Sequence, residues 1–355
     1  MGVSKVIVGT RLTTEASVAR CRHGRLRTVM QQGRPVASSA ELDFLGRIEA
    51  AADRNEVHDA CRRLRADRRA AGQAPARSEV QLAGAAYAYL RGISTHPAFQ
   101  RWVESYFGRR TETFRSGQQK PAFLYYAALE PVPWFATSQV PDLAGVREGM
   151  PGLREELLGV VAAERNFSPY VQVEAARDPL WRGLAGSSDW LATHLLQGGR
   201  WNSALMQRLP RTRAFLDQVP LAQCPPHAPE CFISRLRPGV ELPPHYGLSN
   251  IKLTVHMAIE LPTAGCSITV GGVTRTWTLD DFLIFDDSFL HTAANRSRQD
   301  RTVLIFDVWH PGLSADERDA VAHAIAVLDE MRSAWGGLDE GAIPAAEQAA
   351  PQGSG

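Results

Sequence analysis

Residues 252–261 read KLTVHMAIEL, and apolar and polar side chains alternate through this stretch without a break. Leu253, Val255 and Met257 begin the apolar series, and Lys252 and Thr254 begin the other. Strict alternation is typical of a β-strand, because successive side chains point to opposite faces of a sheet. We therefore expect a strand here, with one packed face and one polar face.

The strand-rich part of the sequence begins at about Cys231. After residue 261, further strands are expected at residues 267–270, 274–278, 282–285 and 302–309. Gly271-Gly272 between the first two indicates a tight hairpin turn. Short strands at regular spacing predict an all-β sandwich or barrel in this part of the chain. Ser314 and Glu317 then form a capping box, which predicts a following helix.

Helical periodicity dominates the region before the strands. Apolar residues recur at three- and four-residue steps from Leu42 to Ile48, and further helices are predicted at 78–93 and 96–107. We expect a poorly patterned segment at 1–38 and a helical domain at 39–130. A β-rich domain with flanking helices should occupy 131–335, followed by a disordered tail at 336–355. The predicted fold class is therefore α+β.

The composition narrows the function classes. The chain has 355 residues, of which 44% are hydrophobic and 22% are charged, so collagen-like, disordered and coiled-coil classes are excluded. The formal net charge of +1 predicts neither nucleic-acid nor membrane binding, and we interpret the arginines at 62–69 as a solvated helix face. Five scattered cysteines without a C-x-x-C motif, and no apolar run long enough to span a membrane, predict a cytoplasmic protein.

Two histidines in the strand-rich region are candidate metal ligands. His245 follows Pro243-Pro244, where a side chain can point into a barrel mouth, and His291 lies 46 residues later. Non-haem Fe(II) is commonly held by an H-x-[DE] motif and a distant histidine. Here Gly247 stands where the acid would be, so on this pattern alone the triad is incomplete.

Arg301 is a second unusual residue, because on a regular strand it shares a face with Val303 and Ile305. An arginine among apolar side chains needs an anion. A dicarboxylate ligand held bidentately would supply one. An internal salt bridge to one of three acids would do so equally well; these are Asp286, Asp287 and Asp307.

Several separate motifs together resemble the aspartyl/asparaginyl β-hydroxylase family of Fe(II)/2-oxoglutarate dioxygenases. They are residues 244–250 (PHYGLSN), 255–256 (VH), 283–291 (LIFDDSFLH) and 301–311 (RTVLIFDVWHP). The resemblance covers roughly residues 185–320, including 200–202, 210–212 and 234–239. Its strength lies in the agreement of both order and spacing.

The resemblance implies a double-stranded β-helix, or jelly roll, with a metal at one open end. In the aspartyl hydroxylase branch, two histidines hold iron and a glycine replaces the acid, which corresponds to His245, Gly247 and His291. Ser234, His256 and Arg301 match the positions that bind 2-oxoglutarate. The implied cofactors are Fe(II), 2-oxoglutarate and O2, with ascorbate as an assisting reductant.

The substrate positions depart from that branch. Lys252 is retained as a candidate contact, and Arg200 and Asn202 are further candidates. However, Thr254 stands where that branch has a substrate-binding arginine. Three other substrate contacts of the branch are also replaced in this chain, by Leu196, Gly198 and Phe232. We therefore expect a substrate other than an EGF-like domain. The expected reaction is β-hydroxylation of an Asp/Asn-like or other amino acid unit in a peptide, a carrier-bound intermediate or a small molecule.

Two alternatives remain open at this point. One is a lipid acyl-chain hydroxylase of the same family, and the other is a non-catalytic jelly-roll binding module. The helical domain could contact a carrier or partner protein in either case. We expect no nucleic-acid or membrane partner.

Overall fold

The computed structural model describes residues 39–51, 79–163 and 166–335, together with Val57, Ala60 and Arg63. The chain divides into two compact units, which are described separately. The first contains residues 93–326. The second contains the described residues between 39 and 92 together with 327–335. The predictions for 1–38, for the tail at 336–355 and for most of the arginine cluster lie outside the described residues, and the predicted domain limits remain predictions.

The second unit contains two of the helices predicted from apolar periodicity, α1 (Ser39–Ala50) and α3 (Glu79–Ile93). Leu45 and Ile48 of α1 are buried, as are Ala86 and Leu90 of α3. The three- and four-residue spacing of these positions places them on one face of each helix.

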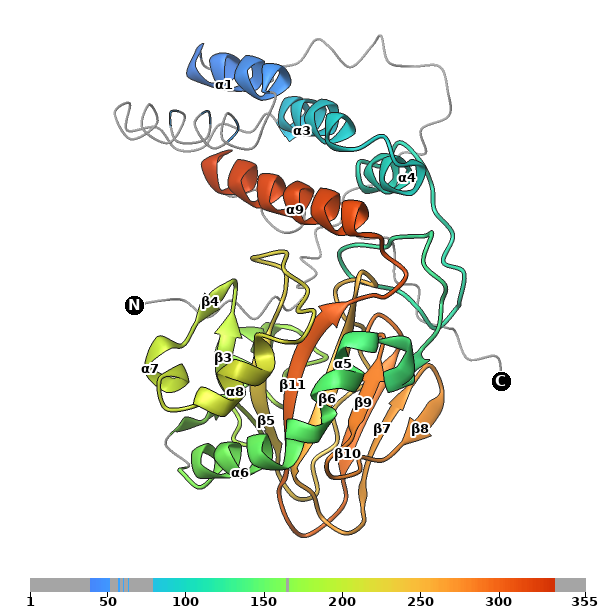
Figure 1. Cartoon of the computed structure of the whole chain (residues 1–355). Helices are drawn as coiled ribbons and strands as arrows, with labels where there is room; N and C mark the ends of the chain where they lie inside the picture. The colour runs from blue at the N-terminus through green and yellow to red at the C-terminus, as the bar shows by residue number, and fades with distance from the viewer. Residues whose placement is uncertain are drawn as a thin grey trace. The chain divides into compact units, whose positions relative to one another are not determined.

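A large antiparallel sheet forms the centre of the first unit (Figure 1). Its strands, in spatial order, are β1 (Trp134–Phe135), β9 (Phe282–Phe285), β6 (Lys252–Glu260), β11 (Arg301–Trp309), β5 (Cys231–Leu236), β3 (Trp190–Gln197) and β2 (Ser168–Pro169), with β4 (Arg200–Trp201) paired to β3. β6 and β11 are long neighbours near the middle, which explains why both are buried along most of their length.

A small sheet has the order β10 (His291–Asn295), β7 (Cys266–Val270) and β8 (Val273–Arg275). The β7–β8 hairpin turns at Gly271 and Gly272, whose φ angles are 56° and 79°. Two positive φ angles in succession are the geometry that glycine adopts without strain. The predicted hairpin is confirmed.

The large sheet has a core on each face. On one face, residues such as Trp190, Val303 and Phe285 pack with Ile268 and Val270 of the small sheet. On the other face, the short helices α5 (Pro141–Val146), α6 (Met150–Val161), α7 (Ser203–Met206) and α8 (Pro210–Leu216) cover the strands (Figure 1). Two facing antiparallel sheets with helices outside form an α+β jelly roll, as expected.

Two expectations about strands need correction. The face of β6 predicted to be polar, in contrast to the packed face, is also buried: Lys252, Thr254 and His256 are each 6% exposed. β3 was not expected at all, because its apolar residues occupy both faces and weaken the alternation. A strand covered on both sides reads as a continuous apolar run rather than an alternating one.

The remaining helices in or entering the first unit are α4 (Pro97–Tyr106) and α9 (Ala315–Trp335). α9 begins with the predicted capping box, in which the Glu317 amide donates to Ser314 Oγ and the Ser314 amide donates to Glu317 Oε2. The Tyr126 hydroxyl also donates to Glu317, at 2.7 Å. Among the helices that the structure describes, none has the length and apolar character needed to cross a membrane.

Candidate functional site

His245 and His291 lie directly opposite each other. His291 is the first residue of β10, and its backbone exchanges two hydrogen bonds with His245, each 2.9 Å long. The centroids of the two imidazole rings are 4.0 Å apart. The jelly roll therefore brings together two residues that are 46 positions apart in the sequence.

Both imidazoles are held in a state suited to metal binding. Nδ1 of His245 is 2.8 Å from the Pro243 carbonyl, and Nδ1 of His291 is 2.9 Å from the Phe289 carbonyl. Since a carbonyl only accepts, each Nδ1 carries the proton and each Nε2 is left with a lone pair. Burial, and next the neighbouring His291 charge, lower the pKa of His245 to about 3, so it is neutral at physiological pH.

The third position of the motif is closed to a side chain. A Cβ on Gly247 would collide with the carboxylate of Asp287, so glycine is what allows Asp287 to lie there. Asp287 in turn makes an ion pair with Lys252. Among the residues that the structure describes, no group of three His, Cys, Asp or Glu side chains is placed to hold a metal. Within the described residues, the candidate metal ligands are therefore the two imidazoles of His245 and His291.

Ser234, His256 and Arg301 share the inner face of the large sheet. Val303 of β11 pairs with Ser234 on β5 and with Ala258 on β6, so these three side chains point to the same face of the sheet. Arg301 is two residues before Val303, and His256 is two residues before Ala258. Because side chains alternate, Ser234, His256 and Arg301 all point to the face that carries the small sheet. Ser234 Oγ accepts from Trp190 Nε1 at 3.0 Å, so its own hydroxyl hydrogen remains available to donate.

His256 is oriented by a tryptophan. Trp277 Nε1 lies 3.3 Å from Nδ1 of His256, and indole N–H can only donate, so the proton of a neutral His256 is on Nε2. Burial, followed by the charges of Arg301 and His291, holds the pKa of His256 well below its usual range. His256 therefore presents an N–H donor at this face.

Arg301 is the most unusual buried group. It is 2% exposed, its Nε has no hydrogen-bond partner, and its guanidinium lies 4.7 Å from the Trp277 ring centroid. Burial lowers its pKa to about 10, which leaves it charged at neutral pH. No acid pairs with it within the described part of the chain. The salt bridges considered from the sequence are absent there, because the three candidate acids have other partners.

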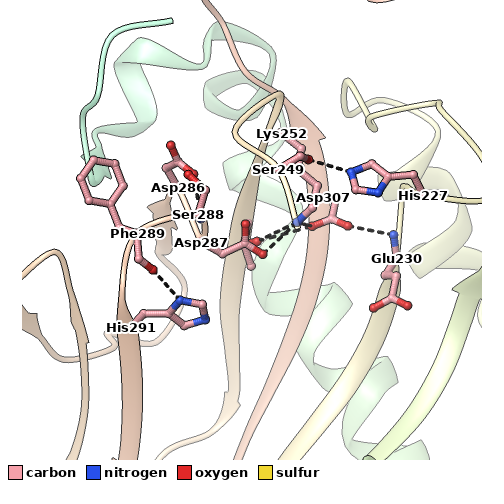
Figure 2. A network of polar contacts seen from close by, with 11 residues as sticks. His227, Glu230, Ser249, Lys252, Asp286, Asp287, Ser288, Phe289, His291 and Asp307 are labelled. Carbon is pink, nitrogen blue, oxygen red and sulfur yellow. Dashed lines mark hydrogen bonds and ion pairs between the residues drawn. The ribbon is translucent and has the colours of Figure 1, made fainter. Parts of the chain in front are cut away.

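Those acids belong to a separate network, drawn in Figure 2. Lys252 Nζ donates to Asp307 Oδ1 at 2.8 Å and to Asp287 Oδ2 at 3.0 Å. Asp286 accepts from the Ser288 amide and from Gln119. Lys252 is thus neither a solvated strand residue nor a free cation, because two carboxylates already surround its ammonium group.

An aromatic group that the sequence analysis did not single out lies beside His245. The Trp181 ring meets the His245 ring edge-on, with 4.9 Å between the ring centroids, and its centroid is 6.1 Å from that of Trp190. Tyr170 stacks on Trp190 and on Phe232, with centroid distances of 4.0 and 5.2 Å. We call Tyr170, Trp181, Trp190 and Phe232 the aromatic wall. The two tryptophans at positions 181 and 190 were the available signal, but the sequence analysis assigned no role to them.

The two other candidate substrate residues lie in and directly after β4. Arg200 is exposed on β4. Asn202 caps α7, since its Oδ1 accepts from the Leu205 amide. Their described contacts are local and connect neither residue with the histidine pair.

The sequence between 147 and 311 matches the family model described as aspartyl/asparaginyl beta-hydroxylase. This match covers a little less than half of the chain. The resemblance seen in the motifs is thereby confirmed, and the curated relatives that match this region are named hydroxylases or hydroxylase domain-containing proteins.

The relatives of this region are similar to the chain over part of their length. Aspartate beta-hydroxylase domain-containing protein 2 of Xenopus tropicalis is 28% identical over 58% of this chain and 55% of its own. Human aspartyl/asparaginyl beta-hydroxylase is 34% identical over 38% of this chain and 18% of its own. The chain thus spans about half of the first relative and a smaller part of the second. Among solved structures, a cupin domain from Enterobacter cloacae is similar to this chain with a TM-score of 0.24 and 13% identity. The similarity covers 35% of this chain and 99% of the cupin domain.

Proposed function

We propose that this chain is an Fe(II)- and 2-oxoglutarate-dependent hydroxylase that acts on an amino acid unit of a peptide, a carrier-bound intermediate or a small molecule. The observation that carries the proposal is Arg301, a buried cation without a described acidic partner on the face that also holds Ser234 and His256. A buried charge is costly unless it is paired, so this position favours an anionic ligand.

The donors on this face fit the two ends of 2-oxoglutarate. Arg301 and the Ser234 hydroxyl would bind the distal carboxylate, and the His256 N–H would contact the end that chelates the metal. His245 and His291 would hold Fe(II) through Nε2, which suits a borderline metal ion. When bound, iron and 2-oxoglutarate supply the oxidising power for inserting one atom of O2 into a C–H bond, with release of succinate and CO2.

The protein itself contributes position and exclusion of water. The backbone carbonyls at Pro243 and Phe289 fix the two imidazoles, and such supporting bonds orient ligands at metal sites. The aromatic wall shields His245 from one side. A cytoplasmic location remains part of the proposal, and the three described cysteines, all unpaired, are compatible with a reducing compartment.

The test is anaerobic titration of the Fe(II)-loaded protein with 2-oxoglutarate, followed by admission of O2 and assay of succinate. We expect a charge-transfer absorption band that saturates with 2-oxoglutarate, and succinate release that requires O2. Ascorbate should prolong the release. A protein that binds neither Fe(II) nor 2-oxoglutarate would contradict the proposed function.

Arg301→Leu should weaken 2-oxoglutarate binding about a hundredfold or more, because a charge-assisted bidentate pair in a buried pocket is lost. Calorimetric titration with 2-oxoglutarate measures this effect. Arg296→Leu is a matched control, since Arg296 is exposed and pairs with Glu241 at the surface. An unchanged affinity in Arg301→Leu would show that Arg301 serves only the fold.

A further inference from the structure

The segment between α4 and β1 contacts both loops that carry the histidine pair. The Ala122 amide donates to the Gly247 carbonyl at 3.0 Å, in the loop that follows the first histidine. The Lys120 amide donates to the Ser288 carbonyl, also at 3.0 Å, in the turn that precedes the second. A segment that supplies no metal ligand of its own therefore holds the two parts of the site.

Gln119 is the residue of this segment whose side chain reaches the turn. It is 1% exposed, and its Nε2 donates to Asp286 Oδ2 at 2.9 Å and to Ser288 Oγ at 3.1 Å. The Ser288 amide in turn donates to Asp286 Oδ1 at 2.9 Å. One primary amide thus links the two side chains that close the turn, and the sequence analysis gave Gln119 no role.

The same turn supplies the carbonyl that orients His291. The Phe289 carbonyl is 2.9 Å from Nδ1 of His291 (Figure 2). Gln119 and Phe289 form an antiparallel bridge, and the Leu290 amide donates to the Gln118 carbonyl at 2.7 Å. A displaced turn would move the Phe289 carbonyl away from Nδ1. The imidazole proton would then also occupy Nε2, the atom that must present a lone pair to a metal.

Stability alone does not explain a buried glutamine at this position. Gln119 Oε1 is buried and has no hydrogen-bond partner among the described residues. An unpaired buried polar atom is costly, and an apolar side chain of similar size would avoid this cost. The two bonds donated by Nε2 are therefore what glutamine contributes here and leucine would not.

His245 is oriented separately. Its Nδ1 is 2.8 Å from the carbonyl of Pro243, which lies in a different loop. The described hydrogen bonds of Gln119 go to the turn before His291 and to the Ser116 carbonyl. A change at Gln119 should therefore affect one histidine of the pair and not the other.

We propose that Gln119 is a positioning residue for His291. Its amide links Asp286 to Ser288, and the turn held in this way presents the Phe289 carbonyl to Nδ1 of the imidazole. The inference rests on the proposed function, because it treats Nε2 of His291 as the atom that binds the metal.

NMR of the metal-free full chain, labelled with ¹⁵N at histidine, tests the proposal. Burial raises the pKa of Asp286 to about 7, so the spectra are recorded at about pH 8, where its carboxylate accepts from Gln119. In the wild-type protein we expect His291 as a single tautomer with its proton on Nδ1. Gln119→Leu should mix the two tautomers of His291 and leave His245 unchanged. Spectra of His245→Asn and His291→Asn assign the signals.

Mn(II) titration gives a second readout that requires no turnover. Gln119→Leu should weaken Mn(II) binding about tenfold, an effect typical of removing the support behind a metal ligand. Ser288→Ala removes one of the two acceptors of Gln119 and should change the His291 tautomers and the Mn(II) affinity in the same direction by less.

Thr193→Val is the matched control. Thr193 is 5% exposed and its Oγ1 donates to the Asn166 carbonyl at 2.8 Å. Its neighbour across β5 is Ile233, which belongs to the core on the helix-covered face of the large sheet. The variant therefore loses a hydrogen bond of similar length on the opposite face, and it should retain both tautomers and the Mn(II) affinity.

The outcomes separate this inference from the proposed function. Unchanged His291 tautomers in Gln119→Leu would overturn the inference, and so would equal changes at His245 or in Thr193→Val. If Gln119→Leu does not fold, unchanged His291 tautomers in Ser288→Ala would overturn it instead. Failure of the wild-type protein to bind Mn(II) and 2-oxoglutarate would overturn the proposed function, whereas the metal-free spectra would still decide whether Gln119 positions His291.

Discussion

Lys252→Met should destabilise the protein by about 3–5 kcal/mol, because it leaves buried carboxylates without their cation. The ammonium group is 2.8 Å from Asp307 and 3.0 Å from Asp287, and the Lys252 side chain is 8% exposed. Methionine keeps most of the length of lysine but has no charge, so the change removes the pairing with little loss of packing. Urea denaturation measures the free energy of unfolding.

The destabilisation should shrink as the pH falls from about 8 to about 5. In the wild-type protein, burial is the largest influence on the pKa of Asp287 and raises it, but the charges of Lys252 and His291 and the hydrogen bonds from Lys252 and Thr254 together hold the pKa below its ordinary value. Without Lys252, burial raises the pKa of both acids. A raised carboxyl pKa in the folded state means that the folded protein binds more protons than the unfolded one, so its stability increases as the pH falls.

Lys120→Met is the matched control for this prediction. Lys120 has no carboxylate partner in the described part of the chain, and we expect a change within about 0.5 kcal/mol. A Lys252→Met protein that keeps its stability but needs a higher substrate concentration for half-maximal rate would instead favour the substrate contact predicted from the sequence.

His245→Ala and His291→Ala should each weaken metal binding by more than about a hundredfold, because each removes one of the two imidazoles. Mn(II) titration followed by electron paramagnetic resonance measures free and bound metal directly, without turnover. His96→Ala is a control at an exposed histidine whose ring contacts Glu317 rather than this site. Succinate release with Fe(II) should be lost in the two site variants and retained in the control.

Asp287→Asn tests the rival ligand set. Asp287 carries a buried oxygen, Oδ1, without a hydrogen-bond partner, and it is four residues from His291. We expect Asp287→Asn to retain most of the metal affinity, because the two imidazoles remain. A loss of binding as complete as in His291→Ala would show that a carboxylate completes the metal site.

Local patterns in the sequence determined several features of this protein. The alternation in 252–261 corresponds to β6, Gly271-Gly272 forms the β7–β8 turn, and Ser314 with Glu317 caps α9. Each depends on contacts within a few residues or on the period of a single strand, which the sequence contains explicitly. The order and spacing of the histidine and arginine motifs also indicated the resemblance to the hydroxylase family, because both are properties of the sequence alone.

Only the tertiary structure decided which charges remain available. Lys252 is neutralised by Asp287 and Asp307, which are 35 and 55 residues away in the sequence, whereas Arg301 meets no acid among the described residues. The aromatic wall likewise depends on the register of β3 against β5, which places Trp190 near Ser234. Pairing of charges and stacking of rings depend on distance in space, and strand register sets that distance. The sequence alone determined the kinds of groups present, and the fold decided which of them meet.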